Sequence, residues 1–319
     1  MEETGIPAKE YHIPALLPQA LDALHITPSG TYVDCTLGGG GHSRAILAQL
    51  DASRGGRLLS FDQDSQAIDR AMADKELTGN RAFTLVHGNF RYLRNYLRFY
   101  NADAVDGILA DLGVSFHHFD DPQRGFSFRW EGPLDMRMNP QAPRDASSLI
   151  AEASPERLAE IFRLYGELPQ ARQLAKAIVS AREKEPITTV EQLLSAVTPL
   201  VNPRREKKEL AQIFQAIRIE VNDEIAALRS LLTQALAVLK PGGRLAVITY
   251  HSLEDRLVKN FMRAGNLEGR QEKDFFGRPL SPLKLCNAKA IVPDEEEIER
   301  NPRSRSAKLR VAVKLPSDT

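Results

Sequence analysis

The stretch Thr31-Tyr-Val-Asp-Cys-Thr-Leu-Gly-Gly-Gly-Gly-His42-Ser-Arg-Ala-Ile-Leu47 decides the fold of this chain. β-Branched and apolar residues come first, the glycines Gly38 to Gly41 follow, and a helix-prone run begins at once. Glycine lacks a Cβ, so the backbone can turn sharply and approach a ligand closely. The following helix offers free N–H groups and the positive end of its dipole. The stretch therefore predicts a strand, a tight turn and a helix that together suit a nucleotide-like cofactor.

The glycine run alone is a weak signal, because a tight turn without a ligand also favours glycine. A second predicted strand, Arg57 to Phe61, leads into Asp62. An acid at this place can accept hydrogen bonds from ribose hydroxyls, each worth about 1.5–3 kcal/mol when charge-assisted. The competing role for Asp62 is to cap the next helix, but Asp64 or Ser65 can cap it instead.

Nicotinamide dinucleotides and S-adenosylmethionine both fit this geometry. The dinucleotide fingerprint needs a further glycine where His42 and Ser43 stand. Asp34 and Gly38 give the form Asp-x-x-x-Gly-x-Gly, which resembles the first motif of class I methyltransferases. The Asp34 carboxylate can meet the ammonium group of a methionine moiety, directly or through the loop, or it can be a buried acid that only braces the loop.

Composition is typical of a soluble chain, with 319 residues of which 42% are hydrophobic and 26% charged. Two cysteines far apart give neither a disulfide framework nor a zinc pattern. No apolar run approaches a membrane span and no secretory signal is visible, so a cytoplasmic protein is expected. The formal net charge is zero, so contact with nucleic acid would depend on local patches. The candidates are the run Arg204–Lys208 and a tail patch of Arg300, Arg303, Arg305, Lys308 and Arg310.

Strand-like and helix-like segments alternate from residue 31 to about 112, which predicts an α/β fold with a mostly parallel sheet. Segments with helical spacing replace them over 116–205, and strands return at 244–250 and 307–315, with an uncertain partner strand within 283–292. The acidic run 294–299 reads as a solvated loop. We therefore predict one domain from 1–115 plus 206–319, and an inserted all-helical domain over 116–205 for RNA-substrate recognition.

Asp111 ends the fourth predicted strand, where a class I methyltransferase aims its methyl group. Acceptors at this place can orient an exocyclic amine, so that alignment provides most of the acceleration. Asp111 is therefore our main catalytic candidate, orienting the amine or contacting the cofactor, with loop capping as its structural alternative. His251 ends the fifth strand and can touch the base or accept a proton, although a structural histidine is as good an interpretation. Of the nearby Phe116, Phe119, Phe126 and Phe128, one could stack on a flipped base, while core packing explains most of them.

The chain resembles a known family, the ribosomal small subunit methyltransferases H, which are 16S rRNA cytosine-N4 methyltransferases of bacteria. The resemblance covers nearly the whole chain. Its motifs are His12-Ile-Pro-Ala-Leu-Leu, Gly38-Gly-Gly-Gly-His42-Ser, His87-Gly-Asn-Phe90, Asp111-Leu-Gly-Val-Ser115, Arg124-Gly-Phe-Ser-Phe128, Gly132-Pro-Leu-Asp-Met-Arg-Met138, Phe214-Gln-Ala-Ile-Arg218, His251-Ser-Leu-Glu-Asp-Arg256 and Asn301-Pro-Arg-Ser-Arg-Ser306.

The resemblance implies methylation of N4 of a cytidine in the decoding region of 16S rRNA, with S-adenosyl-L-methionine as donor and without a metal. The small ribosomal subunit is the implied partner; a homodimer is compatible with the sequence, which does not fix the oligomeric state. The implied cofactor contacts are Gly40, Gly41, His42, Asp62, Phe90 and Asp111.

The chain departs from the family pattern in two places. Phe116 and His118 stand where a serine and a cofactor-facing glutamine are usual. Histidine can also donate or accept a hydrogen bond, so His118 is retained as a cofactor contact. The family's Gly-Glu-Glu run reads Gly166-Glu167-Leu168 here, which puts RNA docking by the insertion in question.

Two other functions remain open from the sequence. A ribosome-assembly factor that has lost turnover is compatible with the changes at Phe116 and His118, and it would bind the subunit without methyl transfer. A nicotinamide-dependent oxidoreductase could use the same glycine loop. Titration with S-adenosylmethionine and with NAD discriminates between the two cofactors.

Overall fold

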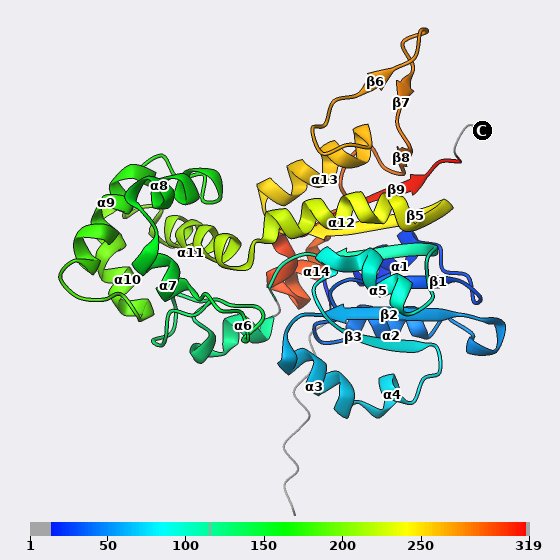
Figure 1. Ribbon diagram of the computed structural model, residues 1–319, viewed down its shortest axis with the longest axis horizontal. Helices are drawn as coiled ribbons and strands as arrows, with labels where there is room; N and C mark the ends of the chain where they lie inside the picture. The colour runs from blue at the N-terminus through cyan, green and yellow to red at the C-terminus, as the bar shows by residue number, and fades with distance from the viewer. Residues whose placement is uncertain (1–13, 115, 317–319) are drawn as a thin grey trace, which may run out of the picture. The chain divides into compact units, whose positions relative to one another are not determined.

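The computed structural model describes residues 14–114 and 116–316, and the chain divides into two compact units (Figure 1). The first unit joins the chain up to Gly113 with the chain from Ala227 onward, and the second is Val114–Ala226. His12, at the start of the first quoted motif, lies outside the described residues.

A seven-stranded sheet forms the centre of the first unit, in the order β3-β2-β1-β4-β5-β9-β8. The first five strands of the chain are mutually parallel, whereas β9 runs antiparallel to both of its neighbours. This confirms the predicted α/β class with a mostly parallel sheet. The strands are β1 (Thr31–Asp34), β2 (Arg57–Asp62), β3 (Phe83–His87), β4 (Val105–Asp111), β5 (Leu239–Thr249), β8 (Leu283–Leu285) and β9 (Lys308–Lys314).

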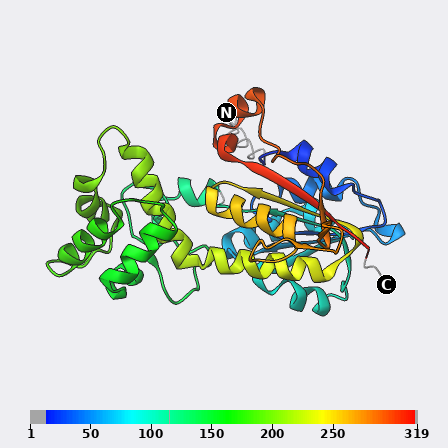
Figure 2. The ribbon, with the colours of Figure 1, turned by 90° about the horizontal axis from the view of Figure 1, so that it is seen from above.

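Helices cover both faces of this sheet because successive strand residues point to opposite sides. Leu59 packs with α5, α12 and α13, whereas its neighbour Leu58 packs with α1, α2 and α3. Figure 2 shows α12 and α13, in yellow and gold, along one face and the blue α1 on the other. The helices are α1 (Leu17–Leu24), α2 (Gly41–Leu47), α3 (Ser65–Ala73), α4 (Lys75–Thr78), α5 (Leu93–Phe99), α12 (Glu224–Val238) and α13 (Ser252–Ala264), with short 3-10 turns η1 (Ala52–Arg54) and η2 (Phe90–Tyr92).

The acidic run 294–299 is a helix rather than the solvated loop that the sequence predicts. Asp294 caps α14 (Glu295–Arg300) by accepting the N–H of Glu297, and three acidic residues occupy its first turn, where they interact favourably with the helix dipole. The Glu297 side chain is buried and accepts the backbone N–H of Leu16 at 2.7 Å. The acidic segment therefore ties the end of the chain to α1. The 3-10 turn η5 (Pro302–Ser306) follows it.

A two-stranded ribbon of β6 (Glu272–Lys273) and β7 (Pro279–Leu280) extends from the first unit between α13 and β8 (Figure 1). Its turn exposes 99% of Phe275 and 78% of Phe276. None of the described helices is both long enough and apolar enough to cross a bilayer.

The second unit is helical. Its elements are α6 (Phe116–Asp120), η3 (Pro122–Arg124), α7 (Ala146–Glu152), α8 (Pro155–Leu164), α9 (Ala171–Arg182), α10 (Val190–Val197), η4 (Thr198–Leu200) and α11 (Glu206–Asn222). The predicted insertion ends at residue 205, whereas this unit continues to Ala226. The physical reason is α11, whose Leu210, Ile213 and Phe214 are buried in the core of the helical unit.

The aromatic cluster after Asp111 packs mainly inside the second unit. Phe126 is buried and lies edge-on to Phe119, and Phe128 lies edge-on to Phe214. The side chain of Phe116 lies outside the described part of the chain. Leu168, which departs from the family pattern, is 3% exposed in the same core, so its apolar side chain contributes to folding of this unit.

Candidate functional site

The glycine loop between β1 and α2 requires glycine for two separate reasons. Gly38 and Gly40 have φ angles of 52° and 78°, in the left-handed region that glycine adopts at little cost. Gly41 is the first residue of α2, and a Cβ there would lie 2.6 Å from Cγ of Pro14. The loop therefore turns tightly from β1 into the start of a helix, as the sequence predicts.

Asp62 braces this loop from the end of β2. Its Oδ2 accepts the N–H of Gly38 and its Oδ1 accepts the N–H of Asp64, both at 2.9 Å. The capping role belongs to Asp64, which accepts the N–H of Gln66 at the start of α3. Each carboxylate oxygen can accept more than one hydrogen bond, and contact between Asp62 and ribose hydroxyls stays a prediction.

Asp34 lies beneath the loop and is fully buried. Its Oδ2 accepts the hydroxyl of Ser43 at 2.6 Å, and its Oδ1 accepts the N–H of Thr36 at 3.1 Å. Burial raises the pKa of Asp34 to about 6, while the Ser43 hydroxyl acts in the opposite direction. Asp34 thus braces the first turn of α2 against β1, which is the second of the two roles that the sequence left open.

Asp111 ends β4 beside the glycine loop, and its side chain is 19% exposed. The hydroxyl of Tyr250 donates to Oδ1 at 2.8 Å, and the backbone N–H of Asp111 donates to Oγ1 of Thr36. Burial raises the pKa of Asp111 to about 7, and Asp34 and Glu254 add to that rise by repulsion. Asp111 can therefore change its charge near neutral pH.

His42 faces Asp111 from the first turn of α2. Nδ1 of His42 lies 3.8 Å from Oδ2 of Asp111, too far for a hydrogen bond. Burial lowers the pKa of His42 to about 4, so the imidazole is neutral near pH 7. Its Nε2 is buried and has no hydrogen-bond partner in the described part of the chain. An unpaired buried nitrogen is costly, and contact between His42 and the cofactor stays a prediction.

The charge of this edge fits S-adenosyl-L-methionine. Asp34, Asp62 and Asp111 are close enough for repulsion to raise the pKa values of Asp34 and Asp111. Over residues 14–114 and 116–316, no Lys or Arg forms an ion pair with Asp34 or Asp111. A cationic ligand would therefore relieve the repulsion, and the donor carries both a sulfonium and an ammonium group.

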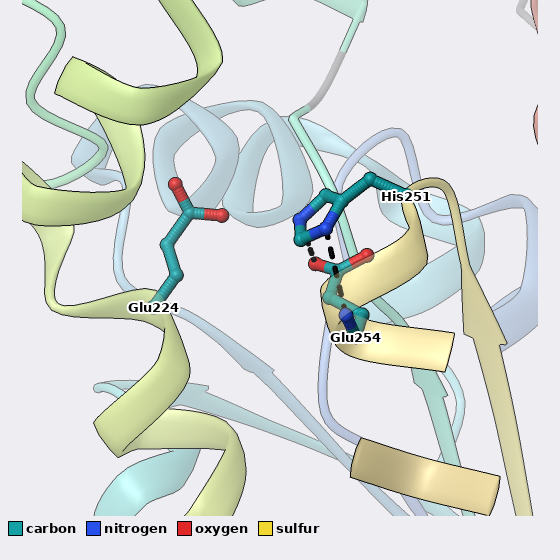
Figure 3. A group of neighbouring side chains, drawn as sticks. All are labelled: Glu224, His251 and Glu254. Atoms are coloured by element: carbon teal, nitrogen blue, oxygen red, sulfur yellow. Dashed lines mark hydrogen bonds and ion pairs between the residues drawn. The ribbon is translucent and has the colours of Figure 1, made fainter. Parts of the chain in front are cut away.

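The sequence has Ser252 and Asp255 at the spacing of a capping box, but the structure caps α13 with His251 instead. Nδ1 of His251 lies 3.5 Å from the backbone nitrogen of Glu254, and Nε2 lies 3.2 Å from Oε1 of the same residue (Figure 3). Asp255 forms two hydrogen bonds with Arg310 on β9. The structural interpretation of His251 thus has direct support, and its catalytic role stays a prediction.

The two remaining predicted cofactor contacts, Phe90 and His118, lie in different units of the chain. Phe90 begins η2 after β3 and packs partly buried against the main core of the first unit. His118 lies on α6 in the second unit, 5% exposed and stacked on Phe126 with ring centroids 4.8 Å apart. Because His118 belongs to the other unit, its contact with the cofactor stays a prediction.

The two basic patches also differ from one another. The run Arg204–Lys208 is exposed at the start of α11. In the tail patch, Arg310 and Lys308 are engaged with Asp255. Arg303 and Arg305 lie exposed on η5, and phosphate contacts by this patch stay a prediction.

Tyr250 and Ser43 are residues of this site that the sequence did not single out. Ser43 lies next to His42 and also contacts the hydroxyl of Ser60 at 2.7 Å. Tyr250 directly precedes His251, and its position at the end of a strand was the available signal. Its partner Asp111 is 139 residues away in sequence, and the pairing depends on β4 lying beside β5.

Comparison with known proteins gives a consistent result. The family model described as the MraW methylase family matches residues 9–315. Proteins named ribosomal RNA small subunit methyltransferase H from Bacteroides thetaiotaomicron and Porphyromonas gingivalis (ATCC 33277) are 57% and 52% identical. They cover 95% and 97% of this chain, and 97% and 99% of their own lengths. Among solved structures, Aeropyrum pernix fibrillarin in complex with S-adenosyl-L-methionine matches at 12% identity with a TM-score of 0.38, over 93% of this chain and 74% of the other.

Proposed function

We propose that this chain, which belongs to the MraW methylase family, methylates N4 of a cytidine in the decoding region of 16S rRNA, with S-adenosyl-L-methionine as donor. The observation that carries the proposal is the carboxyl group of Asp111. It lies beside the glycine loop, at the end of β4, with one oxygen engaged by Tyr250. A hydrogen-bond acceptor for an amine, next to a loop whose charge suits a cationic methyl donor, fits methyl transfer to nitrogen.

The loop side of the site binds the donor. Gly40 and Gly41 bring the backbone close to the donor at the start of α2, where the N–H of Gly40 already donates to the carbonyl of Leu37. Asp62 receives the ribose hydroxyls. His42 contacts the donor from the first turn of α2, where its Nδ1 faces Asp111, and Phe90 contributes apolar surface. When bound, the donor supplies a methyl group on a positively charged sulfur, which becomes a neutral thioether as the carbon–sulfur bond breaks.

Asp111 acts on the cytidine amine. The lone pair of this nitrogen is conjugated with the ring, and an acceptor on its N–H group helps to turn it toward the incoming methyl carbon. As the N–C bond forms, the nitrogen must lose one proton. An ionised Asp111 can accept a hydrogen bond from this N–H and then receive the proton. General-base catalysis of this kind typically raises the rate by about 10²–10⁴-fold. His251 is the second candidate for this proton.

The RNA substrate gives the helical unit its role. The curated relatives are named for small-subunit rRNA, and we assign substrate recognition to the second unit together with the exposed basic patches. The small ribosomal subunit would be the partner, in the cytoplasm.

The decisive experiment is in vitro methylation of small subunits and of naked 16S rRNA from cells that lack this gene. Digestion to nucleosides and mass spectrometry should detect N4-methylcytidine, and primer extension or fragment mapping should place it in the decoding region. Methylation of another nucleoside would reject the specificity but keep the family activity. Subunit binding without transfer would instead support an assembly factor. Tight binding of NAD in place of the sulfonium donor would reject both.

A further inference from the structure

Tyr250 is held in place by three contacts within the first unit. Its backbone N–H donates to Oε2 of Glu254 at 3.1 Å. Its ring packs on the backbone that follows β4, since a Cβ on Gly113 would lie 3.0 Å from the ring atom Cδ2. Its hydroxyl donates to Oδ1 of Asp111 at 2.8 Å. A residue fixed at its backbone, ring and hydroxyl can in turn fix the rotamer of its partner.

The two oxygens of Asp111 are therefore unequal. Oδ1 is engaged by the Tyr250 hydroxyl, while the nearest partner of Oδ2 is Nδ1 of the neutral His42 at 3.8 Å. Oδ2 forms no hydrogen bond with the residues that the structure describes. One oxygen is thus anchored and the other remains available to a ligand.

We propose that Tyr250 is a positioning residue for the methyl transfer, because its hydroxyl anchors Oδ1 of Asp111 and leaves Oδ2 as the acceptor for the amine. This inference rests on the proposed function and adds to it a residue that acts through Asp111. It assigns no direct contact between Tyr250 and the substrate.

The charges around Asp111 make its ionisation depend on the Tyr250 hydroxyl. The ionisable groups that face Asp111 are Asp34 from β1, His42 from α2 and Glu254 from α13, together with Tyr250 itself. Both carboxylates oppose ionisation of Asp111, and His42 is neutral. The Tyr250 hydrogen bond favours the ionised form. Burial and the Asp111 charge raise the pKa of Tyr250 itself, so the phenol remains a donor throughout the working range.

Tyr250→Phe tests the proposal because it removes only the hydroxyl. Loss of one hydrogen bond to a charged group should raise the pKa of Asp111 by about one unit. The acid limb of kcat/KM, measured on subunits that the wild type methylates, should move up by about one pH unit. The rate at pH 7 should fall about fivefold and recover by about pH 9.

Tyr32→Phe is the matched control. Its hydroxyl contacts the N–H of Thr27 and the carbonyl of His25 in the turn before β1, remote from Asp111. This variant should lose stability, while the pH midpoint of the acid limb of kcat/KM should equal that of the wild type. If the pH midpoint of kcat/KM in Tyr250→Phe equals that of the wild type, the proposal is overturned, whatever rate the variant reaches at high pH.

A second measurement applies even if Tyr250→Phe has no measurable turnover. It also tests this inference independently of the substrate assignment. Carboxyl ¹³C resonances of aspartate-labelled protein, with Asp111→Asn identifying the signal, give the pKa of Asp111 without RNA. A rise of about one unit in Tyr250→Phe supports the proposal. An unchanged value overturns it, even if the wild type methylates another nucleoside.

Discussion

The loop half of the site and the amine half are held by different means. The backbone N–H groups of Gly38 and Asp64 hold Asp62, and the N–H of Thr36 contributes to holding Asp34. Asp111 depends on a hydroxyl that lies 139 residues later in the chain. The first arrangement holds its carboxylates with backbone groups that are at most 24 residues away in sequence. The second sets the charge of one reactive group through the packing of two neighbouring strands, so the two halves should respond differently to substitution.

The largest effect should come from the amine half. Asp111→Asn keeps the shape of the side chain and removes its ability to accept a proton, so the rate at saturating donor should fall by about 10²-fold or more. Methyl incorporation at saturating RNA measures this change. A rate within about threefold of wild type would remove Asp111 from the chemistry.

A smaller effect, on a different parameter, is expected from Asp62→Asn in the loop half. The loss of a charge-assisted acceptor should weaken donor binding by about tenfold, since 1.4 kcal/mol is one factor of ten. Calorimetric titration with S-adenosyl-L-methionine measures the Kd, while kcat at saturation should stay within about threefold. A large fall in kcat with unchanged Kd would reverse the division of roles.

Stability against pH should also distinguish the halves. The pKa of Asp111 is about 7 in the folded protein, above its ordinary value of 3.8, so the folded state binds more protons between these values and loses stability as pH rises. Asp111→Asn should therefore be more stable than wild type at pH 8, by up to about 4 kcal/mol from the difference between these two pKa values. The difference should vanish near pH 4. Urea unfolding at both pH values, with equal m-values, provides the comparison.

The smallest effect should come from Ser43→Ala beside Asp34. Removing one hydrogen bond to a buried carboxyl group should cost about 1–2 kcal/mol of stability and change the rate less than threefold. A rate loss comparable to that of Asp111→Asn would show that Asp34 is more than a brace.

Local features of this site were predictable from sequence, and long-range ones were not. The glycine loop, Asp62 and the strand end at Asp111 follow from residues adjacent in the chain. The Tyr250 contact requires knowing that β5 lies beside β4. The same limit explains α14, because its buried Glu297 has its partner at the other end of the chain. The capping of α13 by His251 could not be predicted because it depends on where the helix begins, and Ser252 is already its first residue.

The hydrogen bond from Leu16 to Glu297 has a consequence for how the protein is made. The two residues are 281 positions apart, and the short stretch before α1 includes Pro14, which contacts Gly41 in the glycine loop. During translation this support for the loop cannot form until nearly the entire polypeptide has left the exit tunnel. The helical unit is synthesised in between and can acquire its own core first. This contact is thus a late event, because a nascent chain halted before residue 297 lacks the carboxylate that accepts the N–H of Leu16.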